Sequence, residues 1–330
     1  MKFYVVRIFW QYSLFKAYCA RHSIKPSKAE DSRGAALLSS MVLIPWCRRL
    51  FTEYIVRIFG RGCWIFPIAC ILEGREEYAG MFSYDDYREI IRIIKASGRQ
   101  ADYEGALHRD RFVIMRHDVE YSVERAYALA KVESSMDFTS TFFFQWTNNS
   151  YNLLSRKNRD LICDMHERGQ NIGLHFALNG MTDMQEVRRQ IVKEMHMLSE
   201  MLGFQISEFS IHRPSPAVLA ENIKLPGIIN AYQDEFFTFA ENVTEESKLG
   251  VKYMSDANHI WRYGYPDEKN ILGNDKVQIL THPFAWTKKG YDNYGNFKSL
   301  VQEKYVELIN SIDNECKDFG EYKDGFLELI

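Results

Sequence analysis

Apolar and polar residues follow two recurring patterns from about residue 80 to the end of the chain. In segments such as 84–96 and 183–203, apolar residues recur three or four positions apart, which predicts amphipathic helices. Short runs rich in β-branched and aromatic residues lie between them, as in TSTFFFQW at 139–146, and predict buried strands. The predicted helices are 84–96, 122–134, 152–168, 183–203 and 295–316, and the predicted strands are 112–119, 139–146, 171–176, 208–212, 227–232, 251–255 and 277–282.

This alternation of strands and helices predicts an α/β fold built on a parallel sheet. A glycine-rich GxGxxG turn does not follow the first predicted strand, so the dinucleotide-binding type of open sheet is disfavoured. A (β/α) barrel therefore describes the pattern better than an open sheet.

The first part of the chain differs in charge and composition from the rest. Residues 1–72 hold 11 of the 41 Lys and Arg but 3 of the 44 Asp and Glu, a net charge of +8 against −11 for the remainder. The apolar runs at 41–47 and 63–72 are each too short to cross a bilayer. Three interpretations stay open: a segment on an anionic membrane surface, an extra packing element, or sequence upstream of a natural start at Met81. We predict that residues 1–78 form a poorly ordered or accessory extension and that residues 79–330 form the barrel.

Composition excludes several other classes of protein. With 46% hydrophobic and 14% aromatic residues, the chain can bury a large core. None of its six cysteines forms a CxxC pair, which disfavours a zinc knuckle or a thioredoxin-like redox site. The acidic body lacks an aromatic and basic stacking pattern, so we expect no nucleic-acid partner. No export signal is recognisable, and we expect a cytoplasmic protein in which residues 1–78 are the candidate for a membrane contact.

Four of the nine histidines share one kind of position. His117, His175, His212 and His282 each lie at the carboxyl end of a predicted strand. In a β/α barrel these ends converge on one rim, and that rim holds the active site. Several imidazoles together with the acidic residues of RHDVE at 116–120 predict a metal site or an acid–base cluster there.

Five segments carry a resemblance to a known family. In their order they resemble the motifs of the polysaccharide deacetylase superfamily, also called the NodB-homology or carbohydrate esterase 4-like fold, and in particular its branch whose first motif reads Arg-His-Asp-X-acid. The resemblance spans residues 81–330 and implies a distorted (β/α)7 barrel that acts as a metal-dependent hydrolase on N-acetyl groups of amino sugars. The segments are RHDVE (116–120), IGLHF (172–176), SIHRPSP (210–216), YMSDANHIW (253–261) and ILTHPFAW (279–286).

The resemblance also implies a ligand set, from which this sequence departs at two positions. Asp118 matches the family's metal-binding aspartate and His175 matches its first ligand histidine. Asn179 stands where the second ligand histidine is expected, and His117 stands where the family has its base aspartate. His212 is the nearest replacement by residue type. We therefore predict that Asp118, His175 and His212 hold a divalent cation, for which zinc suits the donors best.

The remaining rim residues receive roles in acid–base chemistry. His282 resembles the family's general acid, which protonates the departing amine, and Asp256 resembles the carboxylate that orients or charges a partner. Glu120 is the candidate base, with His117 as its competitor. Arg213 is expected to pair with Asp256 or to bind an anionic group of the substrate.

The expected substrate is an acetylated amino sugar in glycan or surface-polysaccharide biosynthesis, linked to a nucleotide or a lipid. One alternative is hydrolysis of another non-peptide C–N bond, such as that of a cyclic amide. The other is a barrel that binds carbohydrate without catalysis. Bound metal separates the last alternative from the other two, and acetate release separates those two from each other.

Deletion of residues 1–78 is expected to leave a soluble, folded protein, because the regular strand and helix pattern begins after them. Gel filtration and circular dichroism of the truncated chain check this expectation. Insolubility of the truncated chain would show instead that the extension packs on the barrel or is needed for folding.

Overall fold

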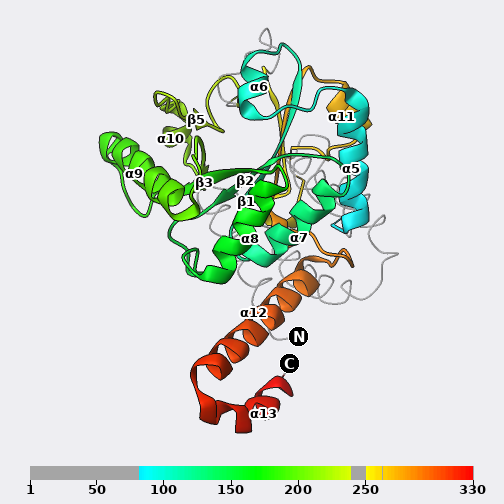
Figure 1. Cartoon of the computed structure of the whole chain (residues 1–330). Helices are drawn as coiled ribbons and strands as arrows, with labels where there is room; N and C mark the ends of the chain where they lie inside the picture. The colour runs from blue at the N-terminus through cyan, green and yellow to red at the C-terminus, as the bar shows by residue number, and fades with distance from the viewer. Residues whose placement is uncertain (1–81, 239–249, 262, 330) are drawn as a thin grey trace, which may run out of the picture. The chain divides into compact units, whose positions relative to one another are not determined.

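The computed structural model describes residues 82–238, 250–261 and 263–329 (Figure 1). The predicted extension, residues 1–78, lies outside this part of the chain. Within the described ranges, no helix is both long enough and apolar enough to cross a membrane.

One sheet of seven parallel strands forms the centre of the fold, in the order β5-β4-β3-β2-β1-β7-β6. The predicted α/β class and its parallel strands are confirmed, and the sheet curls as a distorted, incomplete barrel with β5 and β6 at its edges in the described part of the chain (Figure 1). All strands run in one direction, so their carboxyl ends share one rim. The strands are β1 (Phe112–Val119), β2 (Thr141–Phe144), β3 (Asn171–Ala177), β4 (Glu208–His212), β5 (Ile229–Asn230), β6 (Lys252–Ser255) and β7 (Lys276–Thr281).

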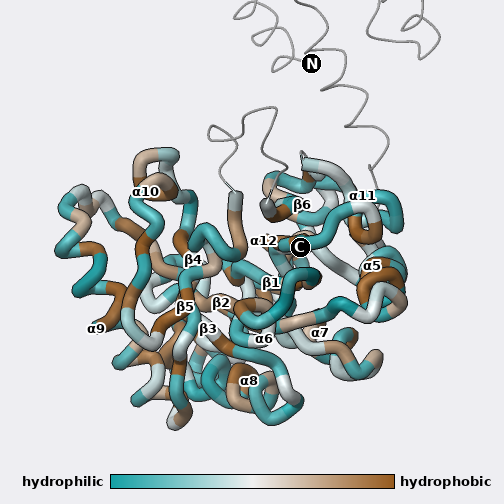
Figure 2. Tube along the Cα trace, turned by 90° about the horizontal axis from the view of Figure 1, so that it is seen from above, coloured by the Kyte–Doolittle hydropathy of each residue, from teal (hydrophilic) through white to brown (hydrophobic). Residues whose placement is uncertain are grey.

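Helices cover the outer face of the sheet. Buried apolar residues recur on one side of α5, α8 and α9, and Figure 2 shows apolar and polar positions interspersed along these helices. Every predicted helix is present, whereas the five-residue helices α6, α10, α11 and α13 are too short to show a helical period. The helices are α5 (Tyr84–Ser97), α6 (Tyr103–Leu107), α7 (Val123–Ser134), α8 (Arg156–Glu167), α9 (Met184–Leu202), α10 (Pro216–Ala220), α11 (Glu268–Leu272), α12 (Asn293–Glu315) and α13 (Lys323–Leu327), with short 3-10 helices at Ala257–His259, Pro283–Ala285 and Lys317–Glu321.

The central strand β1 is buried along its whole length and sends alternate side chains to opposite faces of the sheet. Phe112 and Ile114 pack on the inner face, in a cluster with Phe143. Val113 and Met115 pack on the outer face with the apolar side of α5. The same alternation carries on to the charged residues that follow in the strand.

Gly173 in β3 is required by the close approach of the neighbouring strands. A Cβ atom at this position would lie 2.4 Å from Cδ1 of Phe143 on β2 and 2.9 Å from the carbonyl oxygen of Glu208 on β4. Both distances are shorter than real Cβ contacts, so a larger residue would push the strands apart. His175, two residues further along β3, would move with them.

Arg125 of α7 ties the last long helix and the segment after β7 to the body of the fold. Its guanidinium is buried and donates hydrogen bonds to the Phe284 carbonyl at 2.6 Å and to side chains of α12. Those α12 partners are Asn296, Ser299 and Glu303, at 2.7 to 2.9 Å. Because Phe284 lies two residues after His282, this network also positions the end of β7.

Glu208 begins β4, at the end of the sheet opposite the rim, and the residue is 7% exposed. Burial raises the pKa of Glu208 to about 7, although a hydrogen bond from Thr141 Oγ1 at 3.0 Å lowers it in part. The native state therefore binds this proton more tightly than the unfolded chain does, in which the pKa is about 4.5. Stability from this group is complete below about pH 4.5 and is lost as the pH rises to about 7.

Glu208→Gln is expected to remove this pH dependence, because the amide keeps an oxygen that accepts from Thr141 and never ionises. The variant should gain up to about 3 kcal/mol in unfolding free energy at pH 8 relative to the native chain, and little at pH 4.5. Urea unfolding measured between pH 4.5 and 8 checks this. Glu200→Gln on the exposed face of α9 serves as the matched control. An equal pH slope in the Glu208 variant and the native chain would contradict the assignment.

Candidate metal and active site

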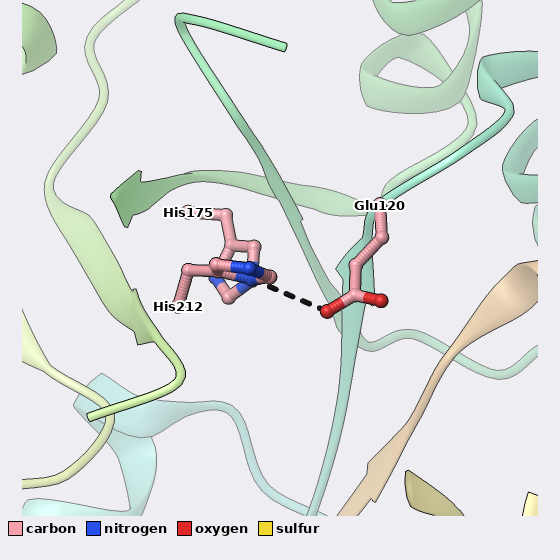
Figure 3. A group of neighbouring side chains, drawn as sticks. All are labelled: Glu120, His175 and His212. Atoms are coloured by element: carbon pink, nitrogen blue, oxygen red, sulfur yellow. Dashed lines mark hydrogen bonds and ion pairs between the residues drawn. The ribbon is translucent and has the colours of Figure 1, made fainter. Parts of the chain in front are cut away.

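Three side chains from neighbouring strand ends meet at the carboxyl rim. Glu120 directly follows β1, His175 lies in β3 and His212 ends β4. One ligand atom from each lies within 4.8 Å of the other two (Figure 3). His175 Nε2 is 3.1 Å from His212 Nδ1, which in turn is 3.2 Å from Glu120 Oε1.

These separations fit a small divalent cation. In a tetrahedral site with bonds of about 2.0–2.1 Å, neighbouring ligand atoms lie about 3.3 Å apart. The two short separations around His212 match that edge length. Two imidazoles and one carboxylate are also a donor set that zinc and other first-row metals accept, and three protein ligands leave a coordination position open for catalysis.

A hydrogen-bond chain fixes the orientation of His175. Its Nδ1 is 2.7 Å from Ser210 Oγ, and the Ser210 hydroxyl donates to Asp118 Oδ1 at 3.1 Å. Since that hydroxyl gives its proton to the carboxylate, Nδ1–H of His175 donates to Ser210 and the Nε2 lone pair is directed at His212. Burial lowers the pKa of His175 to about 4, which keeps the ring neutral. Such outer partners hold a metal-binding histidine in its ligand tautomer.

Asp118 adjoins Nδ1 of His175, the ring nitrogen that does not face His212. It is buried, its Oδ2 is 3.8 Å from His175 Nδ1, and the Arg116 guanidinium donates to it at 3.3 Å. Burial alone would raise the pKa of Asp118, but Arg116 and then His175 hold it below its usual value. Asp118 is therefore an ionised carboxylate that supports His175.

Glu120 occupies the position at which we expected Asp118. Burial would raise the pKa of Glu120, but the hydrogen bond with His212 and the nearby His282 lower it below its usual value. Glu120 is thus ionised with an oxygen 3.2 Å from His212, as a ligand requires. In this structure Glu120 adjoins His212 and Asp118 adjoins Nδ1 of His175, whereas we expected Asp118 to join both histidines.

His282 and Asp256 form a second pair on the same rim. Asp256 Oδ1 is 2.6 Å from His282 Nδ1, and Trp286 Nε1 donates to Oδ2 of the same carboxylate at 2.9 Å. Burial lowers the pKa of His282, but Asp256 outweighs it and raises the pKa to about 9. The free Nε2 of His282 lies 4.0 Å from Glu120 Oε1, so a protonated imidazole faces the three-residue group.

Two residues expected at the site lie elsewhere. His117 points to the helix-covered face, where Nε2 is 2.9 Å from Glu133 Oε1 and Nδ1 is 2.6 Å from Thr281 Oγ1. Arg213 is exposed and, among the described residues, makes neither a hydrogen bond nor an ion pair, so it does not contact Asp256. Neither side chain joins the rim group.

The sequence analysis assigned no role to Ser210 or Arg116. Each lies two residues before a residue that did receive a role: Ser210 before His212, and Arg116 before Asp118. In a strand this spacing places both side chains on the same face, and it is the signal that could have revealed them.

Comparison with known proteins gives structural neighbours only. No family model and no curated protein sequence matches the chain. A family 4 acetyl xylan esterase from Clostridium thermocellum, in complex with a cobalt ion, is similar at 16% identity over 52% of this chain and 73% of that chain, with a TM-score of 0.33. A mutant of the peptidoglycan deacetylase PdaC from Bacillus subtilis matches at 12% identity, over 66% and 96% of the two chains, with a TM-score of 0.33.

A CE4 family pseudoenzyme from Bacillus anthracis matches at 14% identity, over 60% of this chain and 62% of that chain, with a TM-score of 0.33. These neighbours are of the superfamily that the five sequence motifs resemble. At such identities and TM-scores they carry no conclusion about chemistry, and the neighbours include both enzymes and a pseudoenzyme. The functional assignment therefore rests on the side chains of this chain.

Proposed function

We propose that the protein is a metal-dependent hydrolase that removes N-acetyl groups from an amino sugar. The observation that carries the proposal is the group Glu120, His175 and His212, whose ligand atoms lie within 4.8 Å of one another at the carboxyl rim. The adjoining pair His282 and Asp256 supplies the acid that amide hydrolysis needs. The motifs that resemble those of polysaccharide deacetylases contribute the bond type and the substrate class.

Glu120, His175 and His212 would hold the cation, with zinc as the best match to the donors. A bound divalent cation would lower the pKa of a water to about 7 and polarise the scissile carbonyl. Ser210 and Asp118 keep the His175 ring neutral and oriented for this task. The two residues that hold the tautomer of His175, Ser210 and Asp118, thus lie on strands of the sheet.

Asp118 and His282 would move the protons. With Glu120 as a ligand, we assign the acceptance of the water proton to Asp118, which adjoins His175 and is held ionised by Arg116. His282 Nε2 would donate a proton to the departing amine. Asp256 holds the His282 ring through Nδ1 and favours its charged form.

The proposal also covers the substrate and the kind of biosynthesis in which it is used. An acetylated amino sugar linked to a nucleotide or a lipid, in glycan or surface-polysaccharide biosynthesis, remains the substrate that we propose. Release of acetate from acetylated amino sugars by the zinc-loaded protein tests it. Zinc binding without acetate release, but with hydrolysis of a cyclic amide, would favour the other C–N bond.

Glu120→Gln and Asp118→Asn form a matched pair of variants. The first changes a proposed metal ligand, and the second changes the carboxylate proposed as the base. Glu120→Gln should lower the bound zinc well below one per chain, because an amide oxygen is a much weaker ligand than a carboxylate. Asp118→Asn should keep most of the zinc but lose turnover by roughly 10²-fold or more, as for loss of a catalytic base. Elemental analysis and an acetate-release assay on the two purified variants measure both effects.

His108→Ala is the control and should change neither zinc content nor turnover. His108 is exposed and precedes β1, at the end of the sheet opposite the carboxyl rim. The reverse pattern, with zinc lost from Asp118→Asn and kept by Glu120→Gln, would restore Asp118 as the ligand and sink the assignment made here.

His282→Ala is expected to retain zinc and to slow turnover by about 10²- to 10⁴-fold, because the leaving amine would depart without its proton donor. A substrate with a good leaving group, such as an aryl acetate, should lose much less, since its leaving group needs no proton. Comparing the two substrates isolates the role of the acid. Loss of zinc from His282→Ala would show that His282 is a ligand instead.

A further inference from the structure

A polar hollow adjoins the three-residue group on the side of His212. It measures about 280 Å³, and its lining comes from the segment after β2, the end of β3 with the residues that follow, and the end of β4. Apart from His212, no ionisable side chain of the described residues lines it. The lining residues are Gln145, Thr147, Asn148, Asn149, Ala177, Asn179 and His212.

The wall nearest Glu120 is held rigid by Asn148. Its Nδ2 donates to the Glu120 carbonyl at 2.8 Å and also to Gln145 Oε1, and its Oδ1 accepts from the backbone N–H of Ser150 at 2.6 Å. The side chain of Asn148 therefore forms its hydrogen bonds with other groups of the protein. It couples the position of the hollow to that of the proposed ligand Glu120.

Gln145 presents an unused donor to the hollow. The side chain is 6% exposed, and its Oε1 accepts from Asn148. Its Nε2 has no hydrogen-bond partner within the described chain. An amide N–H without a partner in the protein can donate to an acceptor that enters the hollow.

Asn179 presents an acceptor from the opposite side. Its Nδ2 donates to Thr147 Oγ1 at 3.3 Å, which leaves Oδ1 without a partner among the residues that the structure describes. The residue has φ of 48°, a left-handed conformation that asparagine tolerates, and Gly180 continues the turn at φ 84°. Asn179 stands where a ligand histidine was expected, and with His212 in that group its side chain is free for another task.

We propose that this hollow is the subsite for an uncharged sugar ring of the substrate, bound through its hydroxyl and amide groups to Gln145 Nε2 and Asn179 Oδ1. Hydroxyls and N-acetyl groups both donate and accept, as these amides do. A phosphate or carboxylate would lose its hydration here without a cationic partner. The volume lies just below the range of about 300–1,000 Å³ typical of small-molecule sites, which suits one ring. The subsite rests on the proposed function, since His212 forms its wall.

The test measures binding separately from hydrolysis. Ligand-observed NMR titrations with the zinc-loaded full-length chain compare N-acetylglucosamine with N-acetylglucosamine 6-phosphate. The neutral sugar should bind at least tenfold more tightly. Asn179→Gly, which keeps the left-handed backbone and removes the amide, should weaken binding of the neutral sugar about tenfold, the loss expected for one hydrogen bond.

Asn222→Gly is the matched control, because Asn222 also has positive φ, at 41°, and lies outside the hollow. It should leave binding unchanged. Gln145→Glu is the second variant: it keeps the oxygen that accepts from Asn148, removes the free N–H and adds a charge. It should also weaken binding of the neutral sugar by tenfold or more, and thermal unfolding of each variant shows that it is folded.

Unchanged binding in both Asn179→Gly and Gln145→Glu, or tighter binding of the phosphorylated sugar to the native chain, would overturn the subsite. The hydrolase proposal would survive that result if acetate were still released. Conversely, the expected binding pattern without acetate release from any acetylated sugar would support the subsite and sink the hydrolase.

Discussion

The pleat of β1 decides which ionisable side chains reach the rim. Successive residues of a strand point to opposite faces, so Arg116 and Asp118 turn inward while His117 turns to the helices. The register of β1 thus produces two separate hydrogen-bond networks. Asp118 takes part in one on the inner face of the sheet, and His117 pairs with Glu133 on the helix-covered face. A slip of one residue would bury the carboxylate among the apolar helix contacts and carry the imidazole inward. The site depends on this register more than on any loop.

Parallel pairing of β3 with β4 extends the same constraint to the histidines. His175 pairs in register with Ser210, and Ala177 pairs with His212, so Ser210 and His212 share the face on which His175 lies. Ser210 therefore reaches both the His175 ring and the Asp118 carboxylate without a flexible connection. The tautomer of His175 follows from strand pairing. That is why support for a ligand, which in many proteins comes from loops, is here part of the sheet.

The sequence predicted the strand ends well because apolar runs with a polar residue after them are a strong local signal. β1 and β4 begin and end where expected, whereas β5 is only Ile229–Asn230 because pairing with β4 covers just two residues. The approach of Glu120, rather than Asp118, to His212 could not be predicted. Both lie on one face by spacing, and which of them reaches His212 depends on where β1 stops, at Val119. Asp118 is held within the sheet, while Glu120 lies beyond it and can approach the histidines.

The proposal of a ligand histidine on β4, His212, has a consequence for the loop after β3. If Asn179 were the histidine that the family pattern expects, the loop would be tied to the cation and could not vary with the substrate. Under the proposed function His175 and His212 both lie on paired strands, so the sheet rather than a loop would carry the metal-binding geometry. The loop residues Gln145 and Asn179 would then bind the proposed sugar ring, and recognition could change without disturbing the proposed ligands. Under the proposed function, the departure from the family pattern would leave metal binding to the sheet and sugar recognition to the loops.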